Sequence, residues 1–117
     1  MKFPIMLITV LVSALTLALA VNAQAKGEFN REVPKWWIPS ALCVHKYEGS
    51  WQDPGSPYYG GMQMDWTFMH HYGGWTLNHL GTAEHWPIRT QLLVAYRGWK
   101  VQGWSAWPNT SRMCGLR

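Results

Sequence analysis

The first fifth of the chain is much more apolar than the rest. After Lys2, a stretch of about 16 residues from Ile5 to Ala20 carries no charge, which is short for a membrane-spanning helix. Small residues follow it around Ala23 and Ala25. This order of features predicts a signal peptide over residues 1–25, cleaved after Ala23 or Ala25. An uncleaved N-terminal anchor is the alternative.

The next segment, residues 26–40, mixes charged residues with Pro34 and shows no helical period. It is expected to be a leader to the folded domain. A helix is then expected to begin near Ser40, with Ser40 as its cap, and to end at Gly49. Glu48 would lie in its last turn, where the negative end of the helix dipole disfavours ionisation of a carboxyl group.

Two further helices are predicted. The first, over residues 66–72, has Asp65 as its N-cap and ends at Gly73, with a loop over 75–86 after it. The second begins at Pro87, a favoured first helical position, and ends at Gly103. Its apolar residues recur at spacings of four, four and three: Ile88, Leu92, Tyr96 and Trp99.

Residues 51–64 give a different signal. They place the turn sequence Asp53-Pro54-Gly55-Ser56-Pro57 between two apolar runs, a pattern that predicts a two-stranded β-ribbon. With the three helices, this ribbon makes the expected fold class α+β and mostly helical. The folded domain is expected over residues 41–117.

Composition and charge exclude several functions. The chain of 117 residues is long enough for one domain, and its ten Lys and Arg against six Asp and Glu give a net charge of +4. The cations are scattered instead of clustered, so nucleic acid is not an expected partner. The histidines lack the recurrent spacing of metal ligands, and no cofactor is expected.

Cys43 and Cys114 are the only cysteines, so a single disulfide is possible. Export to an oxidising compartment favours its formation. Closing a loop of about 72 residues would stabilise the domain by about 4 kcal/mol on the chain-entropy model. Two free buried thiols are the alternative.

The position of Glu48 suggests chemistry on carbohydrates. It lies between Cys43 and a glycine-containing aromatic run over residues 58–65, in a chain with nine tryptophans. Enzymes that cleave glycosidic bonds use a carboxylic acid in an apolar environment, and aromatic rings that bind the sugars. A solvated surface glutamate is the plain alternative. No Gly-x-Ser-x-Gly sequence surrounds Ser50, which argues against a serine peptidase.

Three features together resemble a known family. They are the run Tyr58-Tyr59-Gly60-Gly61-Met62-Gln63, the run Gln102-Gly103-Trp104-Ser105-Ala106-Trp107-Pro108, and Cys43 ahead of an acidic residue. Over Ala41 to Arg117 the chain resembles the catalytic domain of bacterial resuscitation-promoting factors, in the transglycosylase-like, lysozyme-fold superfamily. The resemblance implies a small lysozyme-like domain with a short β-ribbon beside a cleft and one disulfide.

The resemblance also implies site residues. Glu48 takes the position of the family's catalytic glutamate, Gln102 that of a groove glutamine, and Cys43 with Cys114 that of its disulfide. In the family the glutamate directly follows the cysteine, whereas here residues 44–47 intervene. The residues expected to bind substrate are Trp51, Tyr58, Tyr59, Gln63, Asp65, Thr67 and Gln102.

The implied activity is cleavage of the β-1,4 bond between N-acetylmuramic acid and N-acetylglucosamine in peptidoglycan, with Glu48 acting alone as in a lytic transglycosylase. One alternative is a muramidase that hydrolyses the bond with a second carboxylate, for which Asp53 and Asp65 are the nearby candidates. Another is a non-catalytic module for wall binding or signalling. The protein is expected to be a secreted, wall-associated monomer that binds glycan strands and, after cleavage, does not stay inserted in a membrane.

Overall fold

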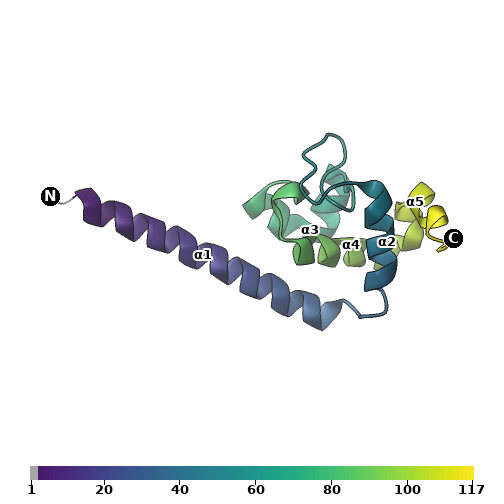
Figure 1. Cartoon of the computed structure of the whole chain (residues 1–117), viewed down its shortest axis with the longest axis horizontal. Helices are drawn as coiled ribbons and strands as arrows, with labels where there is room; N and C mark the ends of the chain where they lie inside the picture. Colours follow the sequence, from purple (N-terminus) through teal and green to yellow (C-terminus); the bar gives the residue numbers. More distant parts are fainter. Residues whose placement is uncertain (1–2) are drawn as a thin grey trace.

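The computed structural model describes residues 3–117, with side chains from Leu15 onward. Its first element is a 30-residue helix, α1 (Phe3–Glu32), whose N-terminal part extends away from the remaining helices (Figure 1). The C-terminal part packs on the domain, where Ala25 and Val33 are buried and Phe29 contacts the core. Residues 26–32 therefore continue α1, although their sequence shows no helical period.

The helix that carries Glu48, α2 (Ile38–Glu48), forms where it was predicted and ends at Gly49. Its start differs from the expectation. Trp37, not Ser40, occupies the N-cap, and a proline lies at one of the first two helical positions. Proline lacks an N–H group, and the first turn of a helix does not need one, so the helix begins without a side-chain cap.

The next helix, α3 (Trp66–Leu80), is longer than predicted. Asp65 is its N-cap, as expected, and accepts a hydrogen bond from the Phe68 N–H at 2.8 Å. Gly73 has non-helical dihedrals (φ −144°, ψ 39°) and kinks the helix without ending it. A Cβ atom at Gly73 would lie 2.8 Å from Val94 Cγ2. The glycine thus allows close packing on the next long helix, and the predicted loop over 75–86 is wrong.

The most buried helix is α4 (Ile88–Gln102), which follows a short 3₁₀ turn, η1 (Ala83–His85). It ends at Gly103, as predicted, and the φ of 64° there favours glycine. It begins one residue later than predicted, because Pro87 is the N-cap and not the first helical residue. Helix α4 contacts both α1 and α3. It is the element around which the other helices are arranged.

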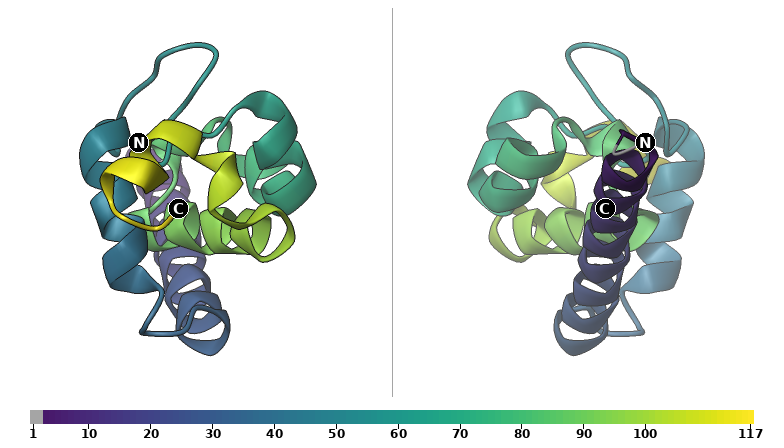
Figure 2. Two further views of the ribbon diagram at one scale, coloured as in Figure 1. Left: turned by 90° about the vertical axis from the view of Figure 1, so that its right-hand side faces the viewer. Right: turned by 90° about the vertical axis from the view of Figure 1, so that its left-hand side faces the viewer.

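Two elements that the sequence pattern did not indicate close the chain. A 3₁₀ turn, η2 (Gly103–Ala106), leads into a short helix, α5 (Pro108–Met113), which packs on α2. Figure 2 shows α5 and α1 on opposite sides of the domain. The indole N–H of Trp107 donates to the carbonyl of Met62 at 2.7 Å, which joins this C-terminal segment to the loop before α3.

The predicted β-ribbon is absent, so the α+β fold class is wrong: residues 3–117 contain helices and no named strand. Between α2 and α3 there is only one isolated bridge, which pairs Tyr59 with Met64. The cause is the buried side chain of Gln91 on α4. It accepts a hydrogen bond from the Gly61 N–H and donates to the Trp51 carbonyl, both at 2.9 Å. A side chain thus satisfies backbone groups that a paired strand would otherwise satisfy.

Within the part of the chain that the structure describes with side chains, no helix is long and apolar enough to cross a membrane.

Candidate functional site

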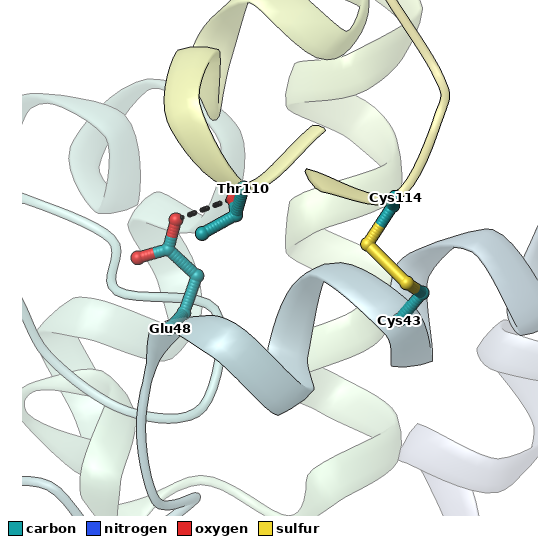
Figure 3. The surroundings of a disulfide bond; sticks show 4 residues. All are labelled: Cys43, Glu48, Thr110 and Cys114. Carbon is teal, nitrogen blue, oxygen red and sulfur yellow. Dashed lines mark hydrogen bonds between the residues drawn. A yellow bond between two sulfur atoms is a disulfide. The ribbon is translucent and has the colours of Figure 1, made fainter. Parts of the chain in front are cut away.

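Glu48 is the last residue of α2, and its half-buried side chain meets α5. The hydroxyl of Thr110, a buried residue on α5, donates a hydrogen bond of 2.8 Å to Glu48 Oε1 (Figure 3). No ion pair holds Glu48 within residues 15–117. The carboxyl group is therefore held by a neutral donor at a junction of two helices.

This environment changes the acidity of Glu48. Burial raises the pKa of the carboxyl group above its usual value, because the charged form loses solvation, and the Thr110 hydrogen bond partly opposes that increase. A carboxyl group with a raised pKa stays protonated at a higher pH than an exposed one. It can therefore act as a proton donor and, once ionised, as a base.

The expected disulfide between Cys43 and Cys114 is confirmed, with a Cα–Cα distance of 6.0 Å. Cys43 lies on α2, the helix of Glu48, and Cys114 directly follows α5, the helix of Thr110 (Figure 3). The covalent bond therefore joins the two elements whose side chains meet at the carboxyl group.

A cavity of about 260 Å³ lies between the loop before α3, the first turns of α3 and the end of α4. Five of the residues expected to bind substrate line it: Tyr58, Gln63, Asp65, Thr67 and Gln102. The sequence interpretation missed the others, among them Phe68, His71, Tyr72 and Trp107. The Gln102 side chain donates a hydrogen bond of 3.0 Å to the Tyr72 hydroxyl. This bond joins the end of α4 to α3 within the cavity lining.

Two expected substrate-binding residues do not line this cavity. The ring of Trp51 stacks on His45 with a centroid separation of 3.8 Å, and it lies so close to Gly61 that a Cβ atom there would be 2.2 Å from it. Tyr59 is half-buried and packs against the core. The structure thus places both aromatic residues in packing positions.

Glu48 is not itself part of the cavity lining. The residue that follows it is close to the lining in space, because a Cβ atom at Gly49 would lie 3.1 Å from Nε2 of the lining residue Gln63. From the other side, Thr110 is three residues after Trp107, which also lines the cavity. The two segments that meet at the carboxyl group, around Gly49 and around Thr110, are therefore both close to residues of the cavity lining.

The two other carboxylates considered from the sequence both have structural partners. Asp53 accepts hydrogen bonds from the Gly55 N–H at 2.8 Å and from Gln63 Nε2 at 2.9 Å, one on each oxygen. Asp65 caps α3 through one of its oxygens. Asp53 is nonetheless close to the acid's helix, since a Cβ atom at Gly49 would be 3.2 Å from Asp53 Oδ2.

The residues described with side chains contain no group of three His, Cys, Asp or Glu that could hold a metal ion. A scan of the chain against protein-family models finds no match, and a search among curated proteins finds none either.

Proposed function

We propose that the chain cleaves the β-1,4 bond between N-acetylmuramic acid and N-acetylglucosamine in peptidoglycan, as a lytic transglycosylase. The observation that carries the proposal is the half-buried Glu48, whose pKa is raised by burial and whose carboxyl group accepts a hydrogen bond from a neutral hydroxyl. The residue after it, Gly49, is close to Gln63 of a cavity lined by amide and aromatic side chains. Such an acid suits protonation of a leaving alkoxide oxygen. Aromatic side chains can stack on the rings of N-acetylated sugars, and amide side chains can hydrogen-bond their acetamido groups.

In the proposed reaction, Glu48 first gives its proton to the glycosidic oxygen as the bond to C1 of the muramic acid breaks. The resulting carboxylate then takes the proton of the C6 hydroxyl of the same sugar, and that oxygen attacks C1. An anhydro ring forms, the carboxyl group regains its proton, and no water is consumed. One acid that acts first as donor and then as base completes the cycle.

The alternative is a muramidase, which needs a second carboxylate as a nucleophile or as a base. Asp53 is the candidate, because it lies near Gly49. Both of its oxygens already accept hydrogen bonds within the loop between α2 and α3. Asp53 thus already has a structural role in the loop, whereas the single-acid reaction requires no second carboxylate.

The disulfide suggests an oxidising environment, such as the exterior of a cell. We propose that the predicted signal peptide leads to export and that the protein acts as a monomer on glycan strands of the cell wall. Net positive charge supports this location, because bacterial envelopes are commonly anionic.

The test is digestion of purified peptidoglycan by the wild-type protein and by Glu48→Gln, with mass analysis of the muropeptides. The variant keeps an acceptor for Thr110 but cannot donate the proton, so turnover should fall by about 10²- to 10⁴-fold. Wild-type products should be one water lighter than hydrolysis products. Asp53→Asn is the matched control and should retain the anhydro products.

Three results would contradict the proposal in different ways. Full turnover by Glu48→Gln would remove the acid from the mechanism. Reducing-end muramic acid as the sole product, lost in Asp53→Asn, would establish the muramidase. Binding of glycan strands without any cleavage by the wild-type protein would leave a non-catalytic wall-binding module.

A further inference from the structure

A second cavity, also of about 260 Å³, adjoins the first along α3. The two share His71 and Tyr72 in their linings. The rest of the lining of the second cavity comes from three helices: Gly73, Gly74, Trp75 and Thr76 of α3, Arg97 of α4, and Gln24 and Glu28 of α1. One helix therefore forms a wall of both cavities, and α1 contributes to the outer one.

We propose that this second cavity is a distal sugar-binding subsite for the same glycan strand that the first cavity holds; the proposal rests on the proposed function. Helix α3 rises about 1.5 Å per residue, so the eight residues from Thr67 to Trp75 extend over about 12 Å. Only an oligosaccharide reaches from one end to the other. The polymeric substrate class has that length.

The lining of the second cavity suits a sugar. Trp75 is 54% exposed, and His79 stacks on its ring with a centroid separation of 4.2 Å. An exposed ring held by a neighbour is a pre-oriented platform for the apolar face of a sugar. Glu28 and Arg97 supply an acceptor and a donor for its hydroxyl or amide groups. Cleavage after Ala23 would leave the whole lining in the chain, whereas cleavage after Ala25 would remove Gln24 and keep the other lining residues.

The glycines of α3 keep this cavity open. A Cβ atom at Gly74 would meet no atom within 4 Å, although the residue lies within the helix and lines the cavity. A larger side chain at position 74 would therefore occupy free space instead of displacing protein atoms. Glycine is the poorest helix former after proline, so its presence here keeps space free at a cost in helix stability.

The experiment compares Gly74→Leu with the matched control Gly74→Ala in the full chain. Binding of N-acetylglucosamine oligomers of two and six sugars is measured beside the digestion of peptidoglycan. Leucine should lower the affinity for the hexamer by about tenfold and leave the affinity for the dimer unchanged, while alanine should change neither. Trp75→Ala, which removes an exposed ring, should reproduce the selective loss. Thermal unfolding shows whether each variant is folded.

The outcomes separate this inference from the proposed function. Equal affinity of wild-type and both variants for the hexamer, or an equal loss for dimer and hexamer, would overturn the distal subsite even if Glu48→Gln abolishes cleavage. A selective loss for the hexamer with no cleavage of peptidoglycan by the wild-type protein would support the subsite and overturn the proposed activity.

Discussion

Glu48 and Glu32 occupy equivalent positions in two helices and have opposite environments. Each is the last residue of its helix, α2 or α1. Glu32 lies at the seam between α1 and α4 and accepts hydrogen bonds from Arg97 Nε at 2.9 Å and Nη2 at 2.7 Å. Glu48 lies between α2 and α5, and its one hydrogen bond comes from the hydroxyl of Thr110.

The two carboxyl groups consequently differ in acidity. The Arg97 hydrogen bonds hold the pKa of Glu32 below its usual value, whereas burial raises the pKa of Glu48. The end of a helix disfavours a negative charge in both cases, so the difference comes from burial at Glu48 and from the charged partner at Glu32. A charged partner makes Glu32 a structural anchor, and a neutral partner leaves Glu48 able to exchange a proton.

The two regions also differ in what holds them together. The seam at Glu32 depends on side-chain contacts, which include an ion pair about one third exposed on each side. The junction at Glu48 depends on a covalent bond, since Cys43 and Cys114 join α2 to the end of α5. The Glu48 junction, where the negative charge is less stabilised, is therefore held by a covalent bond, and the Glu32 seam is not.

The largest expected effect is the loss of that link. The disulfide spans a sequence separation of 71 residues, and its removal in a Cys43→Ser, Cys114→Ser double variant should lower the free energy of unfolding by about 4 kcal/mol. Urea denaturation of the variant and of the oxidised wild-type protein measures this. Arg97→Gln, which breaks the seam, is the comparison and should cost about 0.2 to 1 kcal/mol. Equal costs in the two regions would show that the junction does not depend on its covalent bond.

The next effect concerns the partner of Glu48. Thr110→Val keeps the shape of the side chain and removes the hydroxyl, so the carboxylate loses its donor. Stability at neutral pH should fall by about 1 to 2 kcal/mol. The pKa of Glu48 should rise further, because the Thr110 hydrogen bond lowers it.

The pH dependence of turnover reports the second part of this prediction. In Thr110→Val, the part of the pH–rate profile that reflects ionisation of Glu48 should shift to higher pH. Thr110→Ser keeps a hydroxyl and should have the wild-type profile. A pH–rate profile that is unchanged in both variants would mean that the Thr110 hydroxyl does not affect the pKa of the reacting group.

Local signals in the sequence were sufficient for several parts of this comparison. The end of helix α2 at Gly49 follows from a glycine stop, and Asp65 has the residue type and position of an N-cap. The disulfide follows from there being two cysteines. For the two helix ends the determining residues are near in sequence, and for the disulfide no other pairing of cysteines is possible.

The parts that failed depend on partners far along the chain. The loop between α2 and α3 is held by Gln91, which is 30 residues from Gly61, so an apolar pattern around a turn falsely indicated a ribbon. Helix α3 continues past Gly73 because Val94 packs against that glycine. Thr110 is 62 residues from Glu48, and no local pattern marks it as a partner of the acid.

The smallest expected effect, and the most direct test of the comparison, is a pair of stability profiles with opposite slopes. The folded-state pKa of Glu32 is lowered, so its contribution to stability is present above its ordinary value of 4.5 and is lost as the pH falls through the folded pKa. Glu32→Gln should therefore be less stable than the wild-type protein by about 0.5 to 1 kcal/mol at neutral pH. The difference should close in acid.

Glu48 should give the reverse. Its folded-state pKa is raised above 4.5, so the folded protein holds this proton more tightly than the unfolded chain, and stability is lost as the pH rises through that pKa. Glu48→Gln, whose amide oxygen can still accept from Thr110, should match the wild-type protein in acid and exceed it at neutral pH. Denaturation midpoints of both variants between about pH 3 and 8 measure the two profiles. Slopes of the same sign would show that burial does not raise the pKa of Glu48 while Arg97 lowers that of Glu32, and the assignment of proton transfer to Glu48 would lose its physical basis.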